Sequence, residues 1–363
     1  MKSTHIAQKK APDAASAKLI KSRIDRRLDQ FFDEQIVKSH TQSKEYERLW
    51  KTIKTVAMSG GKRLRPYLLM TSHAAFSGTD DVLEIATAHE LLHISMLMHD
   101  DIIDRDTTRH GEPNVAGRYQ VIYKPQVTSD DIDHYANTAA LLAGDLLISS
   151  AYSLINSSSH LHDSQKTHAI HILHDSIFTV VGGELSDVES SFMSSDLVNP
   201  LHVAHYKTAI YSCVNPLLTG AVLAGASEED QNLLRDFGVN LGIAFQLTDD
   251  LLGVFGSSAK TGKSTVSDLA EGKITYLITQ TLEGISPDER GNFNLYFAKH
   301  DLTETEAEIL RSIIMQSGAY AKTQECIERH IKKAEESLQQ LNSRVGNMTE
   351  LQLLLHKISG RES

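Results

Sequence analysis

The rest of the chain is organised around residues 91–109, LLHISMLMHDDIIDRDTTR. In this stretch an apolar helical run passes directly into a group of acids. Asp100 and Asp104 are four residues apart, so a helix places both carboxylates on one face, one turn apart. Two such carboxylates repel each other unless a cation lies between them. Asp101 is rotated by about 100° from Asp100 and is a weaker candidate ligand. Oxygen ligands without a nearby Cys suit Mg²⁺, so the stretch predicts a magnesium site; a solvated helix end is the alternative.

A second acidic stretch favours the magnesium interpretation. In QLTDD, residues 246–250, Asp249 and Asp250 have apolar residues on both sides. Carboxylates on a buried or cavity-facing helix are costly unless they are paired or bind a metal. Two other acidic pairs lack apolar flanks, and we interpret both as solvated, with residues 80–81 capping a helix and residues 130–131 in a polar loop.

Composition limits the class of protein. The 363 residues carry 36 Lys and Arg against 47 Asp and Glu, a net charge of −11, which argues against nucleic acid as a partner. The two cysteines, Cys213 and Cys326, are far apart in the sequence, so we expect a reducing cytoplasmic location without a disulfide framework. The amino terminus lacks the apolar core of a signal peptide, and we expect no transmembrane segment.

Helical patterns fill most of the chain. Long proline-free stretches rich in Ala, Leu, Glu and Lys favour helix, and no convincing alternating strand pattern occurs. After a flexible tail at residues 1–15, we expect one all-α domain over residues 16–363, a large helix bundle around a central deep cavity. We expect helices at about 16–58, from Pro66, and at 82–104, 135–157, 162–194, 200–226, 228–256, 270–283, 287–299, 303–316 and 319–357, with a loop, or a loop and short helix, over 107–134.

Basic and polar residues accompany the acids. Residues 60–66, GGKRLRP, place Lys62 and Arg65 after a flexible turn, where they can hold a phosphate; a basic helix start is the alternative. His93 lies seven residues before the first acid on nearly the same helix stripe, where a core histidine is the alternative. The run 256–264 imitates a P-loop, but its spacing is wrong and no strand precedes it. The sequence has no HExxH motif and no paired cysteines, so zinc is not expected.

Taken together, the motifs resemble the trans-prenyltransferase family, the polyprenyl diphosphate synthases. GGKRLRP, HDDIIDRDTTR, KT, FQLTDD and GK…SDL…GK occur in this order over roughly residues 45–280. The resemblance implies an all-α fold, usually a homodimer. It also implies Mg²⁺-dependent head-to-tail joining of isopentenyl diphosphate to an allylic diphosphate (dimethylallyl, geranyl or farnesyl diphosphate), with release of diphosphate.

The resemblance further implies a role for each matching residue. Mg²⁺ would be held by Asp100, Asp104 and Asp249, with Asp250 close behind, and these first three acids and Lys207 would be catalytic. Isopentenyl diphosphate would contact Lys62, Arg65 and His93. The allylic diphosphate would contact Arg109, Lys207, Thr208, Gln246 and Lys263.

Four positions depart from the family pattern. His110 replaces a second arginine that normally helps to hold isopentenyl diphosphate, so we expect a weaker or pH-sensitive contact there. Gly253 replaces the last Asp of the second motif, which puts one metal contact in doubt. Glu184 stands where Gln is common, and Leu277 stands where Pro is common.

Product length depends on the helix stripe behind Asp100, along which the product is expected to grow. Ser95 and Met96, five and four residues before Asp100, stand where family members with short products often have aromatic residues. Leu92, about 12 Å before Asp100, is a candidate for a deeper floor. We therefore expect a C20 product, geranylgeranyl diphosphate, or a longer one.

Two alternatives stay open. A terpene cyclase also uses an acidic motif, but it does not need the second diphosphate site that Lys62 and Arg65 suggest. A regulatory subunit of a heteromeric synthase tends to lose the acidic motifs, whereas this chain keeps both. The enzyme interpretation requires that Asp100 and Asp249 face one shared cavity.

Overall fold

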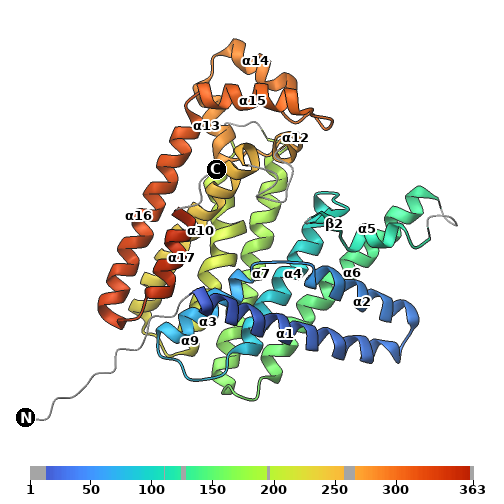
Figure 1. Cartoon of the computed structure of the whole chain (residues 1–363), viewed down its shortest axis with the longest axis vertical. Helices are drawn as coiled ribbons and strands as arrows, with labels where there is room; N and C mark the ends of the chain where they lie inside the picture. The colour runs from blue at the N-terminus through green and yellow to red at the C-terminus, as the bar shows by residue number, and fades with distance from the viewer. Residues whose placement is uncertain (1–13, 110, 124–127, 194–196, 257–265, 360–363) are drawn as a thin grey trace, which may run out of the picture.

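The computed structural model describes residues 14–109, 111–123, 128–193, 197–256 and 266–359, and this part of the chain is almost entirely helical (Figure 1). The exception is a two-stranded antiparallel hairpin, β1 (Thr108–Arg109) and β2 (Glu112–Pro113). The all-α prediction is therefore confirmed. A single domain over residues 16–363 stays a prediction, and of the expected tail at 1–15, residues 1–13 lie outside the described part.

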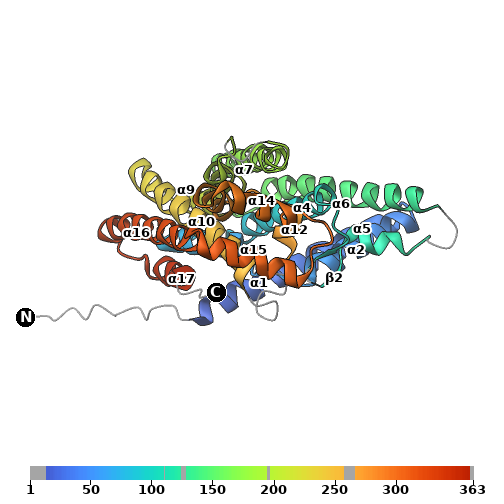
Figure 2. The ribbon, with the colours of Figure 1, turned by 90° about the horizontal axis from the view of Figure 1, so that it is seen from above.

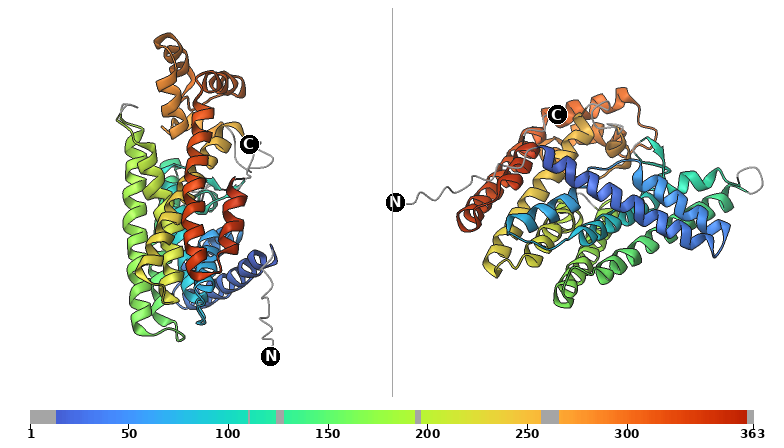
Figure 3. Two further views of the ribbon diagram at one scale, coloured as in Figure 1. Left: turned by 90° about the vertical axis from the view of Figure 1, so that its left-hand side faces the viewer. Right: turned by 60° about the horizontal axis from the view of Figure 1, so that its bottom comes forward.

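The amino-terminal half of the chain supplies the helices around the first acidic motif. They are α1 (Ala14–His40), α2 (Lys44–Met58), α3 (Leu64–Ala75), α4 (Leu83–Ile103), α5 (Val115–Gln120), α6 (Ser129–Ser157) and α7 (Asp163–Ser190). Helix α4 carries the motif and packs chiefly against α6, while α1 lies across one face of the bundle (Figure 3).

The carboxyl-terminal half supplies the helices around the second motif. They are α8 (Pro200–Val203), the π-helix η1 (Ala204–Val214), α9 (Asn215–Leu223), α10 (Glu228–Phe255), α12 (Ser267–Glu271), α13 (Tyr276–Gly284), α14 (Pro287–Tyr296), α15 (Glu304–Gln316), α16 (Ala319–Val345) and α17 (Thr349–Ser359). Helix α10 packs between α16 and η1. Seen from above, α16 and α17 lie on one side of the molecule and α5 and α6 on the other (Figure 2).

Several expected boundaries were wrong. The helix expected over 16–58 is two helices, because the chain turns at residues 41–43 and the Ser43 hydroxyl accepts the Tyr46 N–H at 3.1 Å to start α2. The helix expected over 319–357 breaks at Gly346, whose φ of 79° ends α16. The helix expected over 200–226 contains the π-helix η1.

The two comparison pairs of acids both begin helices. The expected cap was only partly right: α4 begins directly after this pair and Asp81 accepts the Leu83 N–H at 3.1 Å, but the N-cap residue is Val82, whose side chain makes no capping hydrogen bond. The loop expected at residues 130–131 was wrong. Thr128 caps α6, and both acids lie in the first turn of this helix, where their negative charges interact favourably with the positive end of the helix dipole.

Helix α6 is, among the described residues, the one helix that is long and apolar enough to cross a membrane by length and composition. Its most apolar window of 18 residues is 44% buried inside the molecule, because one side of α6 packs against α4 and α5. The core helix of a globular protein has the same composition. The absence of a transmembrane segment stays a prediction.

Candidate active site

A cavity of about 1110 Å³ opens between the two halves of the bundle. Its lining includes most of the residues implicated by the sequence. They come from the turn before α3 and from α3, α4, β1, η1 and α10: Lys62, Arg65, His93, Arg109, Lys207, Thr208, Gln246, Asp249 and Asp250. The structure therefore brings together residues that are up to 188 positions apart, from Lys62 to Asp250 (250 − 62).

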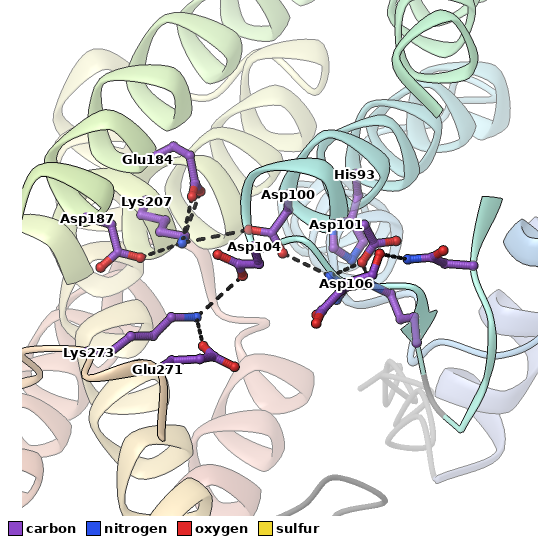
Figure 4. Close-up of polar contacts among 12 residues, drawn as sticks. His93, Asp100, Asp101, Asp104, Asp106, Glu184, Asp187, Lys207, Glu271 and Lys273 are labelled. Carbon is purple, nitrogen blue, oxygen red and sulfur yellow. Dashed lines mark hydrogen bonds and ion pairs between the residues drawn. The ribbon is translucent and has the colours of Figure 1, made fainter. Parts of the chain in front are cut away.

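The first acidic motif lies at the edge of this cavity, in contact with two of its lysines. Lys207 Nζ lies 3.8 Å from Asp100 Oδ1, and Lys273 Nζ lies 3.4 Å from Asp104 Oδ2 (Figure 4). Both lysines line the same cavity as Asp249. Of the first motif Asp101 lines this cavity, whereas Asp100 and Asp104 contact its two lysines and are not themselves among the lining residues. That Asp100 and Asp249 share one metal cluster stays a prediction.

Two neighbouring helices pack very closely against the backbone of the π-helix η1 and fix its position in the site. A Cβ atom on Gly183 of α7 would lie 2.4 Å from Lys207 N, and one on Gly242 of α10 would lie 2.4 Å from Ala209 Cα. A side chain fits at neither position, so both glycines are needed for this packing. π-Helical segments are frequent at functional sites, and here the π-helix η1 carries the KT pair.

Lys207 and Thr208 connect the two acidic motifs through η1. Thr208 Oγ1 donates a 2.6 Å hydrogen bond to Gln246 Oε1, and Gln246 Nε2 donates one of 2.8 Å to Asp250 Oδ1. Burial raises the pKa of Asp250 to about 7, and the charges of Asp268, Asp249 and Asp187 add to this rise. Acidic side chains therefore crowd around the second motif.

Lys207 is surrounded by acids. Its ammonium group lies 2.6 Å from Asp187 Oδ2 and 3.0 Å from Glu184 Oε2, in addition to Asp100 (Figure 4). Burial lowers the pKa of Lys207, but the charges of Asp187, Glu184 and Asp100 outweigh it, and the pKa is raised. Lys207 is therefore a permanent cation. Glu184, which departs from the family pattern, here supplies part of this acidic surrounding.

Arg109 is held by the first acidic motif. Its Nη2 lies 2.9 Å from Asp100 Oδ2, and its Nε donates a 2.6 Å hydrogen bond to Asp101 Oδ1. Asp101 is buried, and burial raises its pKa to about 6 against the opposing charge of Arg109. Arg109 therefore binds both Asp100 and Asp101, and which of the two is the better metal ligand stays a prediction.

The donor chemistry of the cavity fits a hard divalent cation. No three acidic, His or Cys side chains converge on one point within the described residues. Carboxylates are nevertheless in excess, and burial raises the pKa of both Asp104 and Asp250. Buried carboxylates with raised pKa values gain from a cation that replaces their protons. Oxygen-only donors of this kind suit Mg²⁺.

Of the basic residues after Gly60-Gly61, Arg63 has a structural role that the sequence did not reveal. Arg63 is buried, with its backbone in the left-handed region (φ 53°), and its guanidinium lies 2.9 Å from Glu90 Oε1 and 2.8 Å from Asp25 Oδ1. This ion-pair network fixes the turn, so Lys62 and Arg65 on either side reach the cavity.

Arg65 and His93 meet on Tyr211 of η1. The Arg65 guanidinium carbon lies 4.3 Å from the centre of the Tyr211 ring, and His93 Nδ1 lies 3.2 Å from the Tyr211 hydroxyl. Arg65 Nη2 donates a 2.5 Å hydrogen bond to Ser212 Oγ, whereas Nε is buried and, within the described part of the chain, has no hydrogen-bond acceptor. A buried donor of this kind at a cavity wall favours an anionic ligand.

The residues expected to limit product length lie behind the cavity wall. Ser95 is fully buried, and its hydroxyl donates a 2.9 Å hydrogen bond to the Gly144 carbonyl of α6. Leu92 is also buried, Met96 is partly buried, and none of the three is among the cavity-lining residues. Their role in product length stays a prediction.

Of the remaining positions that the sequence singled out, one lies in the core and others lie outside the described residues. Leu277 is fully buried in the core between α10, α13 and α15. His110, Lys263 and the P-loop-like run after Gly256 lie outside the described residues. The sequence did not single out Asp187, although Glu184 and Asp187 are three residues apart, a spacing that places both on one helix face.

Comparison with known proteins gives the same family. The model of the polyprenyl synthetase family matches residues 46–341. A geranylgeranyl diphosphate synthase from Sulfolobus acidocaldarius is 32% identical over 87% of this chain and 93% of its own length. A geranylfarnesyl diphosphate synthase from Aeropyrum pernix is 30% identical over 77% of this chain and 83% of its own.

A solved structure agrees with these relatives. The geranylgeranyl pyrophosphate synthase of Corynebacterium glutamicum, crystallised with isoprenyl diphosphate and magnesium, superposes with a TM-score of 0.84 at 25% identity, over 96% of this chain and 99% of that one. The family match covers most of the chain, and the cavity and both acidic motifs fall within it. The chain therefore belongs to the polyprenyl synthetase family of prenyltransferases.

Proposed function

We propose that this enzyme joins isopentenyl diphosphate head-to-tail to an allylic diphosphate, with Mg²⁺, and makes an all-trans prenyl diphosphate of about C20 or longer. One observation carries the proposal. A single cavity contains an acidic region that suits metal-bound diphosphate and, separately, a basic wall of Lys62, Arg65 and His93 that suits a second diphosphate. Two anion sites in one cavity are what a condensation of two diphosphates needs.

The first site is assigned to the allylic diphosphate. Asp100, Asp104 and Asp249, with Asp250 behind them, would hold Mg²⁺, which when bound neutralises the diphosphate and assists its departure. Lys207 carries a permanent positive charge at this place and stabilises the negative charge that develops on the leaving group. Thr208 and Gln246 position this wall through their hydrogen bond. Arg109, and Lys263 outside the described residues, are assigned to the same ligand.

The second site is assigned to isopentenyl diphosphate. Arg65 presents a buried Nε donor, and Tyr211 orients both Arg65 and His93 toward the cavity. The double bond of this substrate attacks the allylic cation, and a proton then passes to the released diphosphate. Ile94, Leu97 and Met98 give the cavity an apolar wall, which excludes water from the cation. His110 would complete this site if it takes the place of an arginine.

A homodimer is part of the proposal. Exposed apolar side chains gather on α6 and α7: Leu141, Leu142, Phe178, Val181 and Leu185. An exposed apolar surface over two neighbouring helices is typical of a subunit interface. Cys213 and Cys326 are buried free thiols, which agrees with a reducing cytoplasmic location.

The test is product analysis. Purified protein is incubated with Mg²⁺, labelled isopentenyl diphosphate and farnesyl diphosphate, and the products are identified by mass spectrometry. We expect geranylgeranyl diphosphate or longer chains, loss of product in Asp100→Asn and Asp249→Asn, and no loss in Asp130→Asn, a matched change in an exposed first turn of α6. A cyclic hydrocarbon formed without isopentenyl diphosphate would indicate a terpene cyclase, and activity only with a partner chain would indicate a regulatory subunit.

A further inference from the structure

Gly253 stands one helical turn after Asp249 on α10 and lines the cavity. The family pattern has a third acid at this position, which this chain lacks. A Cβ atom on Gly253 would lie 2.0 Å from Asp268 Oδ2 and 3.1 Å from Asp268 Cγ. A side chain at residue 253 would have to displace the Asp268 carboxylate, which occupies the space beside this glycine.

Asp268 comes from α12, which packs against α10. It lines the cavity together with Asp249 and Asp250, and its charge contributes to the raised pKa of Asp250, after the larger effect of burial. The carboxylate is therefore close to the second acidic pair and in the same cavity.

Short as it is, α12 is anchored by the residues that follow this carboxylate. The next residue, Leu269, is buried, and its carbonyl accepts the Ala298 N–H at 3.0 Å. Gly272 then ends α12 with a φ of 71°, so that Lys273 reaches Asp104 of the first motif at 3.4 Å. One segment thus presents an acid to the second motif and a cation to the first.

We propose that Asp268 supplies the third carboxylate of the second acidic site, in the place that a side chain at residue 253 would otherwise fill. The proposal rests on the proposed function only in that the site is a Mg²⁺ site. It assigns to this chain a division of the site between two helices, α10 and α12, instead of one. The glycine leaves the space that the carboxylate from α12 occupies.

Metal binding tests the proposal without turnover. Mn²⁺ replaces Mg²⁺, inorganic pyrophosphate is present, and bound Mn²⁺ is counted by electron paramagnetic resonance. Asp268→Asn, which keeps the side-chain shape, should weaken Mn²⁺ binding about tenfold or more. Asp288→Asn, an exposed first-turn acid of α14, is the matched control and should bind as the unmodified protein does. Unchanged binding in folded Asp268→Asn would overturn the proposal.

A reciprocal exchange tests where the charge must be. Gly253→Asp alone should be destabilised by the clash with Asp268, whereas Gly253→Asp combined with Asp268→Gly restores one carboxylate to the same place and should recover Mn²⁺ binding. If the folded double variant binds Mn²⁺ no better than Asp268→Asn does, the role of Asp268 is only to stabilise α12, and the proposal is overturned. Absence of prenyl transfer with Mn²⁺ binding still dependent on Asp268 would refute the proposed reaction and leave this assignment standing.

Discussion

Thr208 donates a 2.6 Å hydrogen bond to Gln246 and so ties the π-helix η1 to the acidic end of α10. The preceding residue, Lys207, is held by Asp187 and Glu184 of α7 and reaches Asp100 of α4. Two consecutive residues therefore fix the separation of the two acidic motifs.

Replacing Lys207 with Met should lower kcat/KM for the allylic diphosphate by about 10²–10³, because one preorganised cation at the leaving group is lost. Steady-state kinetics with saturating isopentenyl diphosphate measure the change. Lys299→Met removes a lysine that is paired with Glu306 on the surface and should leave kcat/KM unchanged. Rates within threefold of each other in the two variants would contradict the role of Lys207.

Replacing Arg63 with Met should lower the free energy of unfolding by about 3–5 kcal/mol, because buried Glu90 then loses its cation. Urea denaturation followed by circular dichroism measures the loss. Arg344, which pairs with Asp230 and Glu229 at the surface, is the matched position, and Arg344→Met should change the unfolding midpoint little. Equal stability of the two variants would show that the network around Arg63 is not needed.

Stability should fall as the pH falls below about 6.5, in part through His89. Burial, helped by the charge of Arg65, lowers the pKa of His89 from 6.5 to about 3 in the folded protein. Between these values the unfolded chain binds the proton and the folded chain does not, so the free energy of unfolding decreases with decreasing pH, by at most about 1.4 kcal/mol per pH unit.

Urea midpoints at several pH values between 4 and 7.5 measure this contribution. His89→Gln should flatten the acid side of the stability profile, and His300→Gln, at an exposed position, should leave the profile parallel to that of the unmodified protein. The contribution of His89 is refuted if the unfolding free energy of His89→Gln falls with pH as steeply as that of the unmodified protein and of His300→Gln.

Replacing Ser95 with Phe should shorten the product. The Ser95 hydroxyl lies 2.9 Å from the Gly144 carbonyl, so a large ring at residue 95 must intrude between α4 and α6 and narrow the space behind the first acidic motif. Mass spectrometry of the prenyl diphosphates measures chain length, and Ser95→Ala, which adds no volume, should keep the original length. An unchanged product from a folded Ser95→Phe enzyme would count against this stripe as the floor.

Local patterns were enough to predict the helical class and part of the site. The spacing of Asp100 and Asp104 and the apolar flanks of Asp249 are local features, and the structure places both motifs at one cavity. Partners that are distant in sequence could not be predicted in this way. Arg63 pairs with Asp25 and Glu90, 38 and 27 residues away, and no local pattern marks such a buried pair.

Helix breaks and helix type were also missed, for different reasons. Ser43 and Gly346 are ordinary cap residues, so the ends of α2 and α16 could have been read from the sequence. The π-helix could not, because it depends on how η1 is enclosed by α7 and α10 at Gly183 and Gly242. The carboxylate of Asp268 at Gly253 likewise depends on contact between two helices.

The π-helix constrains the length of the chain as well as its composition. Each i→i+5 turn holds an extra residue, so deleting one residue from η1 would let the segment relax to ordinary α-helical pairing. The backbone hydrogen-bond partners of the residues after Thr208 would then change by one position. Either Thr208 would lose its hydrogen bond to Gln246, or α9 would lose its packing against α3, where the Ser72 hydroxyl donates a hydrogen bond to the Leu217 carbonyl. A gap introduced into this interval in a sequence alignment would therefore misassign the residues that line the catalytic chamber.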